Sequence, residues 1–128
     1  MVFPPPGSGF GGSLPACYGR VMRLRGRVAI VTECGHGEGF GVVWARALAA
    51  EGAAVLVADA DPARAEAVAA DLVARGGRAD AFAVDIGSQA SCAALAARAL
   101  TRFDRIDGLV NTHHLWRDLR RDDASDEY

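Results

Sequence analysis

The sequence predicts an α/β fold, in which a parallel sheet is flanked by helices. From Met22 onward, short apolar segments with the character of strands alternate with Ala- and Leu-rich segments of helical period. This alternation is typical of βαβ units. The chain has 128 residues, of which 51% are hydrophobic and 23% charged, and these values suit one globular domain with one core.

Four segments are expected to form the strands. The first, residues 27–32, is a nearly continuous apolar run of the kind found in parallel strands buried on both faces. Residues 54–59, 79–85 and 106–111 have similar character, although alanines weaken the segment 79–85 by β propensity. Because βαβ crossovers are right-handed, the expected strand order is 3-2-1-4, the first part of a doubly wound sheet.

Three helices are expected between these strands. The first shows helical spacing at Trp44, Ala47 and Leu48. Asp61 and Pro62 provide an N-cap and a first-turn proline for the second, and Ser88 an N-cap for the third. Glycines follow the first two helices as stops, at Gly52, Gly76 and Gly77. The expected buried positions are Ala65, Val68, Ala69 and Leu72 in the second helix, and Cys92, Leu95, Ala96, Leu100 and Phe103 in the third.

Two glycine-rich segments compete as phosphate loops. GSGFGG, residues 7–12, fits the spacing G-x-G-x-x-G, but MVFPPP precedes it and no apolar helical run follows. The fingerprint is informative only between a strand and a helix, because the helix N-terminus then faces the anion. We therefore interpret residues 1–21 as a disordered leader rich in Gly and Pro.

The second segment, ECGHGEGFG at residues 33–41, does lie between a strand and a helix. Gly35, Gly39 and Gly41 allow the backbone to turn tightly and approach a pyrophosphate. Asp59 ends the second strand 18 residues later, close to where dinucleotide folds place an acid against the ribose hydroxyls. The alternatives are a flexible connecting loop, and an Asp59 that is solvated in a turn or competes with Asp61 for the helix cap.

Together these motifs resemble the classical short-chain dehydrogenase/reductase (SDR) family. The resembling segments are LRGRVAIVT (24–32), the loop glycines, VLVAD (55–59), VDI (84–86) and RIDGLVN (105–111). The resemblance implies a Rossmann-like NAD(P)-binding domain over residues 22–114, truncated after the fourth strand and equivalent to the amino-terminal half of a usual member. It also implies that Asp85 and Ile86 lie beside the adenine, that Asn111 lines the cofactor site, and that Phe40 belongs to the cofactor-binding loop.

Asp59 favours NAD as the cofactor over NADP. Its carboxylate can accept hydrogen bonds from both ribose hydroxyls, whereas a 2′-phosphate would meet like charge, so we expect a preference above about tenfold. Arg64 is the cation near enough in sequence to help a 2′-phosphate. From a helix capped by Asp61, it is expected to need to turn back toward the loop.

Two departures from the family pattern affect the cofactor loop. Glu33 and Cys34 separate Thr32 from Gly35, where the family has Thr directly before its first loop Gly, and both Glu33 and Glu38 bring negative charge near the pyrophosphate. NTHH, residues 111–114, replaces the family's Asn-Asn-Ala-Gly. Its two histidines are interpreted as loop residues, because no acid or Cys cluster completes a metal site.

A third departure concerns catalysis. The family uses a Ser, a Tyr and a Lys four residues after that Tyr, but this chain has no lysine, and its tyrosines are Tyr18 and Tyr128. We expect no catalytic residue, and a chain that is inactive alone as the NAD(P)-binding portion of an SDR-type oxidoreductase. The alternative is a non-catalytic nucleotide-binding or protein-interaction module.

Charge and cysteine content narrow the partners and the compartment. The net charge of -2 and the pI near 5.9 favour neither nucleic acid nor an anionic membrane. Three cysteines without a C-x-x-C pair fit reduced thiols in a cytoplasm. Residues 115–128 are interpreted as a charged tail or as the start of the family's next helix. The open edge of the fourth strand invites self-association.

Overall fold

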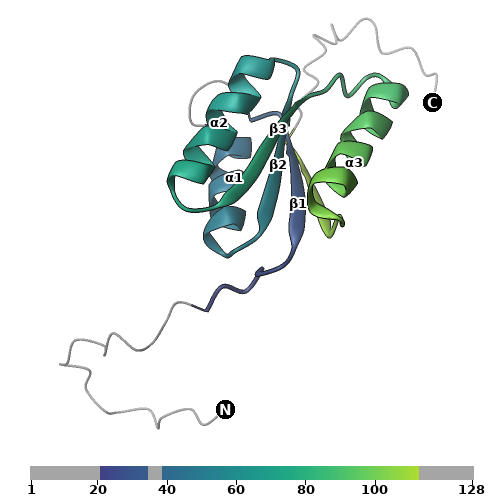
Figure 1. Cartoon of the computed structure of the whole chain (residues 1–128). Helices are drawn as coiled ribbons and strands as arrows, with labels where there is room; N and C mark the ends of the chain where they lie inside the picture. Colours follow the sequence, from purple (N-terminus) through teal and green to yellow (C-terminus); the bar gives the residue numbers. More distant parts are fainter. Residues whose placement is uncertain (1–20, 35–38, 113–128) are drawn as a thin grey trace, which may run out of the picture.

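A four-stranded parallel sheet forms the centre of the structure (Figure 1). The structure is a computed structural model and describes residues 21–34 and 39–112. The strands are β1 (Val28–Thr32), β2 (Ala54–Asp59), β3 (Arg78–Ala83) and β4 (Gly108–Asn111), and the helices are α1 (Phe40–Ala50), α2 (Pro62–Ala74) and α3 (Gln89–Phe103). The order β3-β2-β1-β4 confirms the predicted Rossmann-like sheet. Residues 1–20 of the expected leader, Gly35 and the expected tail lie outside the described residues.

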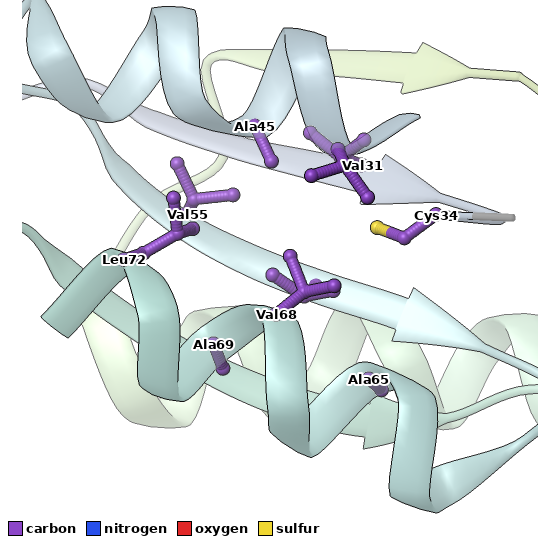
Figure 2. Close-up of a cluster of buried hydrophobic side chains, with 10 residues drawn as sticks. Val31, Cys34, Ala45, Val55, Ala65, Val68, Ala69 and Leu72 are labelled. Atoms are coloured by element: carbon purple, nitrogen blue, oxygen red, sulfur yellow. The ribbon is translucent and has the colours of Figure 1, made fainter. Parts of the chain in front are cut away.

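Helices cover both faces of the sheet, with α1 and α2 on one face and α3 on the other (Figure 1). The core on the first face includes Val31, Val55, Val68 and Leu72 (Figure 2). Val42 and Val57 belong to the same cluster. The core on the second face includes Val28, Ile30, Leu56, Val84, Leu95 and Phe103. Since alternate strand residues point to opposite faces, the continuous apolar runs of β1 and β2 supply both cores.

The helix ends follow the predicted signals. The Asp61 side chain accepts a hydrogen bond from Ala63 N at 3.0 Å, with Pro62 in the first turn of α2. Ser88 Oγ accepts from Ser91 N at 3.3 Å at the start of α3. The four buried positions predicted for α2 are confirmed. Local capping chemistry therefore sets where these two helices begin.

The residues that face the core in α1 and α3 differ in part from the predicted ones. In α1 the buried residues are Gly41, Val42 and Ala45, and Trp44 is 50% exposed. In α3 the prediction that Leu100 is buried is wrong, because it is 50% exposed while Ala99 is buried. Successive helix positions are about 100° apart, so a neighbour of a core residue points away from the sheet.

The strand bounds differ from the predicted ones by up to two residues. β3 runs from Arg78 to Ala83 rather than over 79–85, and β4 begins at Gly108 rather than at residue 106. The shorter β4 results from Asp107, which takes part in a tight set of contacts at the amino end of β1. Its backbone N–H donates to Val28 O at 2.8 Å, and its Oδ2 accepts from Val28 N at 2.8 Å.

Two arginines also bind the Asp107 carboxylate. Arg105 Nη2 lies 2.6 Å from Oδ1 and Arg27 Nη1 lies 3.1 Å from the same atom. The hydrogen bond from Arg105, followed by the one from Val28 N, lowers the pKa of Asp107 to about 2. The carboxylate thus joins the segment before β4 to the start of β1 in its ionised form.

Asp107→Asn should remove part of the pH dependence of folding. The folded pKa of about 2 lies below the value of about 3.9 for a free Asp, so the contribution to stability is present above the unfolded pKa and is lost as pH falls through the folded one. We expect the stability difference between wild type and Asp107→Asn to be largest above about pH 4 and to vanish toward about pH 2. Urea unfolding across this pH range measures it.

Asp104→Asn is the matched control. Asp104 is exposed and has φ 68°, a backbone conformation that Asn also tolerates. Its substitution changes the same charge three residues away without touching the β1–β4 contact. A difference for Asp107→Asn that does not vary with pH would contradict the prediction.

Candidate functional site

The candidate site lies at the carboxyl edge of the sheet, where the ends of all four strands meet. Thr32, Asp59 and Asn111 are the last residues of β1, β2 and β4. The register pairs Thr32 with Ala58 on one side and with Asn111 on the other. In open α/β sheets this edge, at the point where the strand order reverses, is the usual ligand site.

The described part of the glycine-rich loop leads directly into α1. Gly39 is the N-cap residue, and its carbonyl oxygen accepts from Val42 N at 3.0 Å. Within the described residues, no side chain caps this helix and no acid lies in its first turn. Phe40 is 75% exposed. Uncapped N–H groups at a helix start, with the positive end of the helix dipole, can hold an anion such as a pyrophosphate.

Gly41 is required by close packing of α1 on the end of β1. A Cβ at this position would lie 2.7 Å from the Cα of Cys34 and 3.0 Å from the carbonyl carbon of Glu33, with the Glu33 carbonyl oxygen closer still. Glu33 itself has φ 47°, an uncommon conformation for a residue other than Gly. The two residues that separate Thr32 from Gly35 in the sequence are therefore packed directly beneath the start of α1.

Asp59 is buried, with its side chain only 3% exposed, and it connects three segments. Oδ2 accepts from Cys34 N at 3.1 Å, at the start of the loop. Oδ1 accepts from Asp61 N at 2.9 Å, at the start of α2. Asp59 is thus neither solvated nor the cap of α2, which is Asp61. A carboxylate has about four acceptor positions, so two protein donors leave room for hydroxyl donors of a ligand.

Arg64 lies closer to Asp59 than the sequence indicated. Its Nη1 is 3.5 Å from Asp59 Oδ1 and its Nη2 is 3.5 Å from Asp61 Oδ2. The side chain thus already has the backward direction, toward the end of β2, that Arg64 was expected to need. Position three of α2 points the side chain back over the helix start, as helical side chains generally do.

Cys34 contributes structure rather than reactivity. It is fully buried between α1 and α2 at the end of β1 (Figure 2). Burial, and to a lesser extent the charge of Asp59, raise the pKa of its thiol to about 11. The thiol is therefore neutral at physiological pH. The contact with Asp59 is made by the backbone N–H of Cys34.

Asp85 and Ile86 line a small cavity next to Asp59. The cavity has a volume of about 140 Å³ and is also lined by Glu33, Ala60 and Val84. Asp85 Oδ1 accepts from Gly87 N at 2.9 Å, so this side chain also stabilises the turn before α3. Asp85 thus both stabilises this turn and lines the cavity.

Asn111 and Thr112 organise the end of β4. Thr32 Oγ1 donates to Asn111 Oδ1 at 2.6 Å. Thr112 Oγ1 lies 2.7 Å from the carbonyl oxygen of Thr32 and 2.6 Å from that of Glu33. The sequence analysis did not predict a role for Thr112. The one sequence feature that could have indicated such a role is its position, where the family has its second Asn. Asn111 and Ile86 border an apolar groove of about 400 Å³ between α3 and β4.

Two findings on the described ranges concern possible metal ligands and helix length. Residues 21–34 and 39–112 hold no group of three or more His, Cys, Asp or Glu side chains placed to bind a metal. No helix in this part of the chain has the length and apolarity to cross a membrane. His113 and His114 lie outside the described residues.

Comparison with known proteins agrees with this arrangement. The sequence model of the short chain dehydrogenase family matches residues 27–124, most of the chain. The chain belongs to the short-chain dehydrogenase family. An uncharacterized oxidoreductase of Methylorubrum extorquens is 36% identical over 109 residues, which are 84% of this chain and 43% of that protein.

Solved structures of SDR proteins have the same fold. A metagenomic short-chain oxidoreductase in complex with NADP superposes with a TM-score of 0.62 at 36% identity, over 68% of this chain and 38% of the other. A 7α-hydroxysteroid dehydrogenase complexed with NADH and 7-oxo glycochenodeoxycholic acid gives a TM-score of 0.66 at 36% identity, over 71% and 35%. This SDR chain therefore spans less than half the length of the relatives it matches.

Proposed function

We propose that this chain is the NAD(P)-binding part of an SDR-type oxidoreductase and holds a nicotinamide dinucleotide at the carboxyl edge of its sheet. The observation that carries the proposal is the start of α1, which no described side chain caps and where Gly41 packs closely on Cys34, the residue whose N–H donates to Asp59. The described residues fit such a ligand, since an anion site, a buried acid and a small cavity follow one another along the edge.

Each candidate residue has a proposed role along the dinucleotide. Gly35, Gly39, Phe40 and Gly41 form the loop against the pyrophosphate. Asp59 accepts from the adenosine ribose hydroxyls, and Asp85 and Ile86 lie beside the adenine. Asn111 lines the site farther along the edge. When bound, the dinucleotide would supply the hydride acceptor or donor of the oxidoreductase reaction.

NAD is the proposed cofactor in preference to NADP. The family includes proteins solved with NADP and with NADH, so the acid at the end of β2 is the feature that supports NAD here. Isothermal titration with both dinucleotides tests the proposal. We expect NAD to bind at least about tenfold more tightly than NADP. A chain that binds neither dinucleotide would refute the cofactor role.

The chain alone should show no turnover with either nicotinamide cofactor. It contains no lysine, and its two tyrosines, Tyr18 and Tyr128, are remote from the candidate site in sequence. An arginine stays protonated and cannot replace the family's lysine freely. The measurement is the absorbance of the reduced nicotinamide with a panel of simple alcohols and ketones. Turnover above that of a boiled control would show that other residues perform the chemistry.

Self-association through β4 is the second proposed property. β4 pairs with β1, and no described strand pairs with its other edge. Beside that edge, Leu109 is 63% exposed and Ile106 is 39% exposed. A second copy is the partner that we favour, since two identical edges can pair about a two-fold axis and cover the same apolar side chains.

Leu109→Lys should therefore shift the chain toward the monomer. Light scattering after size-exclusion chromatography measures the mass, and wild type is expected to show a dimer that increases with concentration. Val73→Lys, at a 54% exposed apolar position on α2, is the control and should leave the dimer intact. A wild-type chain that is monomeric at every concentration tested would contradict this prediction.

Three cysteines without a C-x-x-C pair support a cytoplasmic setting for the proposed function.

A further inference from the structure

A cavity of about 500 Å³ lies between the carboxyl ends of α1 and α2. It is at the opposite end of these helices from the candidate site, which adjoins their first residues. Small-molecule sites in proteins usually have volumes of about 300–1,000 Å³, an apolar lining and a few polar groups. The size of this cavity therefore suits a small molecule.

Much of the cavity wall is apolar. The apolar side chains that line it are those of Met22, Leu72 and three alanines of α1, Ala47, Ala49 and Ala50. Gly77 lines it as well, and a Cβ there would lie 3.4 Å from the Cβ of Ala49. Small residues thus keep the space between the two helices open. An apolar group of a ligand would lose its contact with water in this space, which favours binding.

Two arginines of the cavity wall bind one carboxylate. Arg46 Nε, in α1, lies 2.9 Å from Asp71 Oδ2, and Arg75 Nε, at the end of α2, lies 3.0 Å from both oxygens of Asp71. The hydrogen bond from Arg46, followed by the one from Arg75, lowers the pKa of Asp71. The three side chains together carry one net positive charge beside the apolar wall.

Arg75 has donors for a second acceptor. Both of its hydrogen bonds with Asp71 are made by Nε, and its side chain is 59% exposed. A guanidinium has five N–H donors in a planar fork. The Nη groups of Arg75 can therefore bind a further carboxylate while Nε stays on Asp71.

The helix ends offer little to a cation. Carbonyl groups at the end of a helix carry partial negative charge and attract cations when they lack a donor. Here Leu72 O accepts from Gly77 N at 2.9 Å, and Ala49 O accepts from Gly52 N at 3.0 Å. Because these carbonyls have donors, the arginines set the preferred charge of a ligand. One net positive charge matches an anion with a single charge.

We propose that this cavity binds a small monocarboxylate, with its carboxylate on Arg75, beside Arg46, and its apolar part against Leu72 and the alanines of α1. A carboxylate matches the planar donor fork of a guanidinium with two parallel hydrogen bonds. The site is separate from the proposed dinucleotide site, so neither proposal depends on the other.

The test is an NMR titration of the full isotope-labelled chain with three probes. Benzoate has a carboxylate and an apolar ring, benzamide has the ring without the charge, and acetate has the charge without the ring. We expect benzoate to shift the amide signals of Gly76 and Gly77, which line the cavity. It should bind at least about tenfold more tightly than either other probe, because the charge and the apolar contact both contribute.

Two substitutions should change the affinity in opposite directions. Arg75→Gln removes the donor fork and should raise the Kd of benzoate about fivefold, the size typical of an exposed ion pair. Asp71→Asn removes the competing carboxylate and should lower that Kd about threefold. Both substitutions break the same ion pair, so an effect through stability alone would change the Kd in the same direction. Such a result would overturn the proposal.

Ala47→Phe tests the cavity itself. Ala47 is exposed and lines the cavity, so a ring at this position would fill the space without disturbing the core. The Kd of benzoate should rise more than about tenfold, because the ring occupies the place of the ligand. Ala70→Phe adds the same ring at an exposed position of α2 outside this cavity and should leave the Kd unchanged.

Two results with the wild-type chain would also overturn the proposal. The first is no binding of benzoate, or binding of benzamide with equal affinity, because the arginines would then have no part in recognition. The second is a set of shifted signals that does not include Gly76 and Gly77, because benzoate would then bind elsewhere on the chain.

Discussion

Gly41→Ala is expected to destabilise the domain by about 3 kcal/mol, the upper end of the range for overpacking. The added Cβ would lie 2.7 Å from the Cα of Cys34. The obstacle is backbone rather than the end of a flexible side chain, so α1 must move away from β1 as a unit. That movement would also displace the loop that we propose for the pyrophosphate. Urea unfolding gives the stability.

Gly108→Ala is the control for this substitution. A Cβ at Gly108 would meet nothing within 4 Å, so the stability should change by less than about 0.5 kcal/mol. If both alanine variants were equally stable, the close approach of α1 to residues 33 and 34 would be wrong.

Asp59→Ala is expected to reduce both stability and NAD affinity. The substitution leaves Cys34 N and Asp61 N without their acceptor. Each buried N–H without a partner costs about 1–3 kcal/mol, so a loss of about 3 kcal/mol is expected in total. NAD affinity should fall by more than about tenfold, because the ribose hydroxyls lose their acceptor as well. Thermal melting and isothermal titration measure the two effects.

Asp61→Asn is the matched control for Asp59. It removes the same charge two residues later, and Asn is as good an N-cap as Asp. We expect stability and NAD affinity close to those of wild type. Asp59→Asn is the milder companion variant, which keeps one acceptor oxygen. Unchanged NAD affinity in Asp59→Asn and in a folded Asp59→Ala would show that this carboxylate organises the loop without contacting the ribose.

Much of the fold could be predicted from the sequence because its signals are local. The runs of β1 and β2 are long and apolar, and Asp61 and Ser88 are N-caps whose effect extends only over the next turn. Strand order followed from the handedness of crossovers, which holds for nearly all βαβ units. These rules need no knowledge of distant contacts.

The predictions that were wrong concern residues whose structure depends on contacts with residues far away in the sequence. β4 starts at Gly108, and the preceding Asp107 binds Val28, a partner 79 residues away. Leu100 is exposed and Ala99 is buried, so the way α3 packs on the sheet sets which of the two neighbours faces the core. In the candidate site, the loop glycines and Asp59 were predicted from spacing and their cofactor role stays a prediction, and Gly35 lies outside the described residues. The place of Arg64 against Asp59 depends on a side-chain direction that spacing does not specify.

The position of β1 in the sheet also has a consequence for the order of folding. β1 pairs with β2, which follows it closely, and with β4, which arrives about eighty residues later. Closing so long a loop is entropically costly, so the unit from β1 to β3, with α1 and α2, can form while β4 is still being synthesised. Until then the Thr32 side chain and the N–H of Val28 lack their partners in β4 and the segment before it. We therefore expect β4 to dock after that unit has formed, and its docking brings Asn111 to the candidate site.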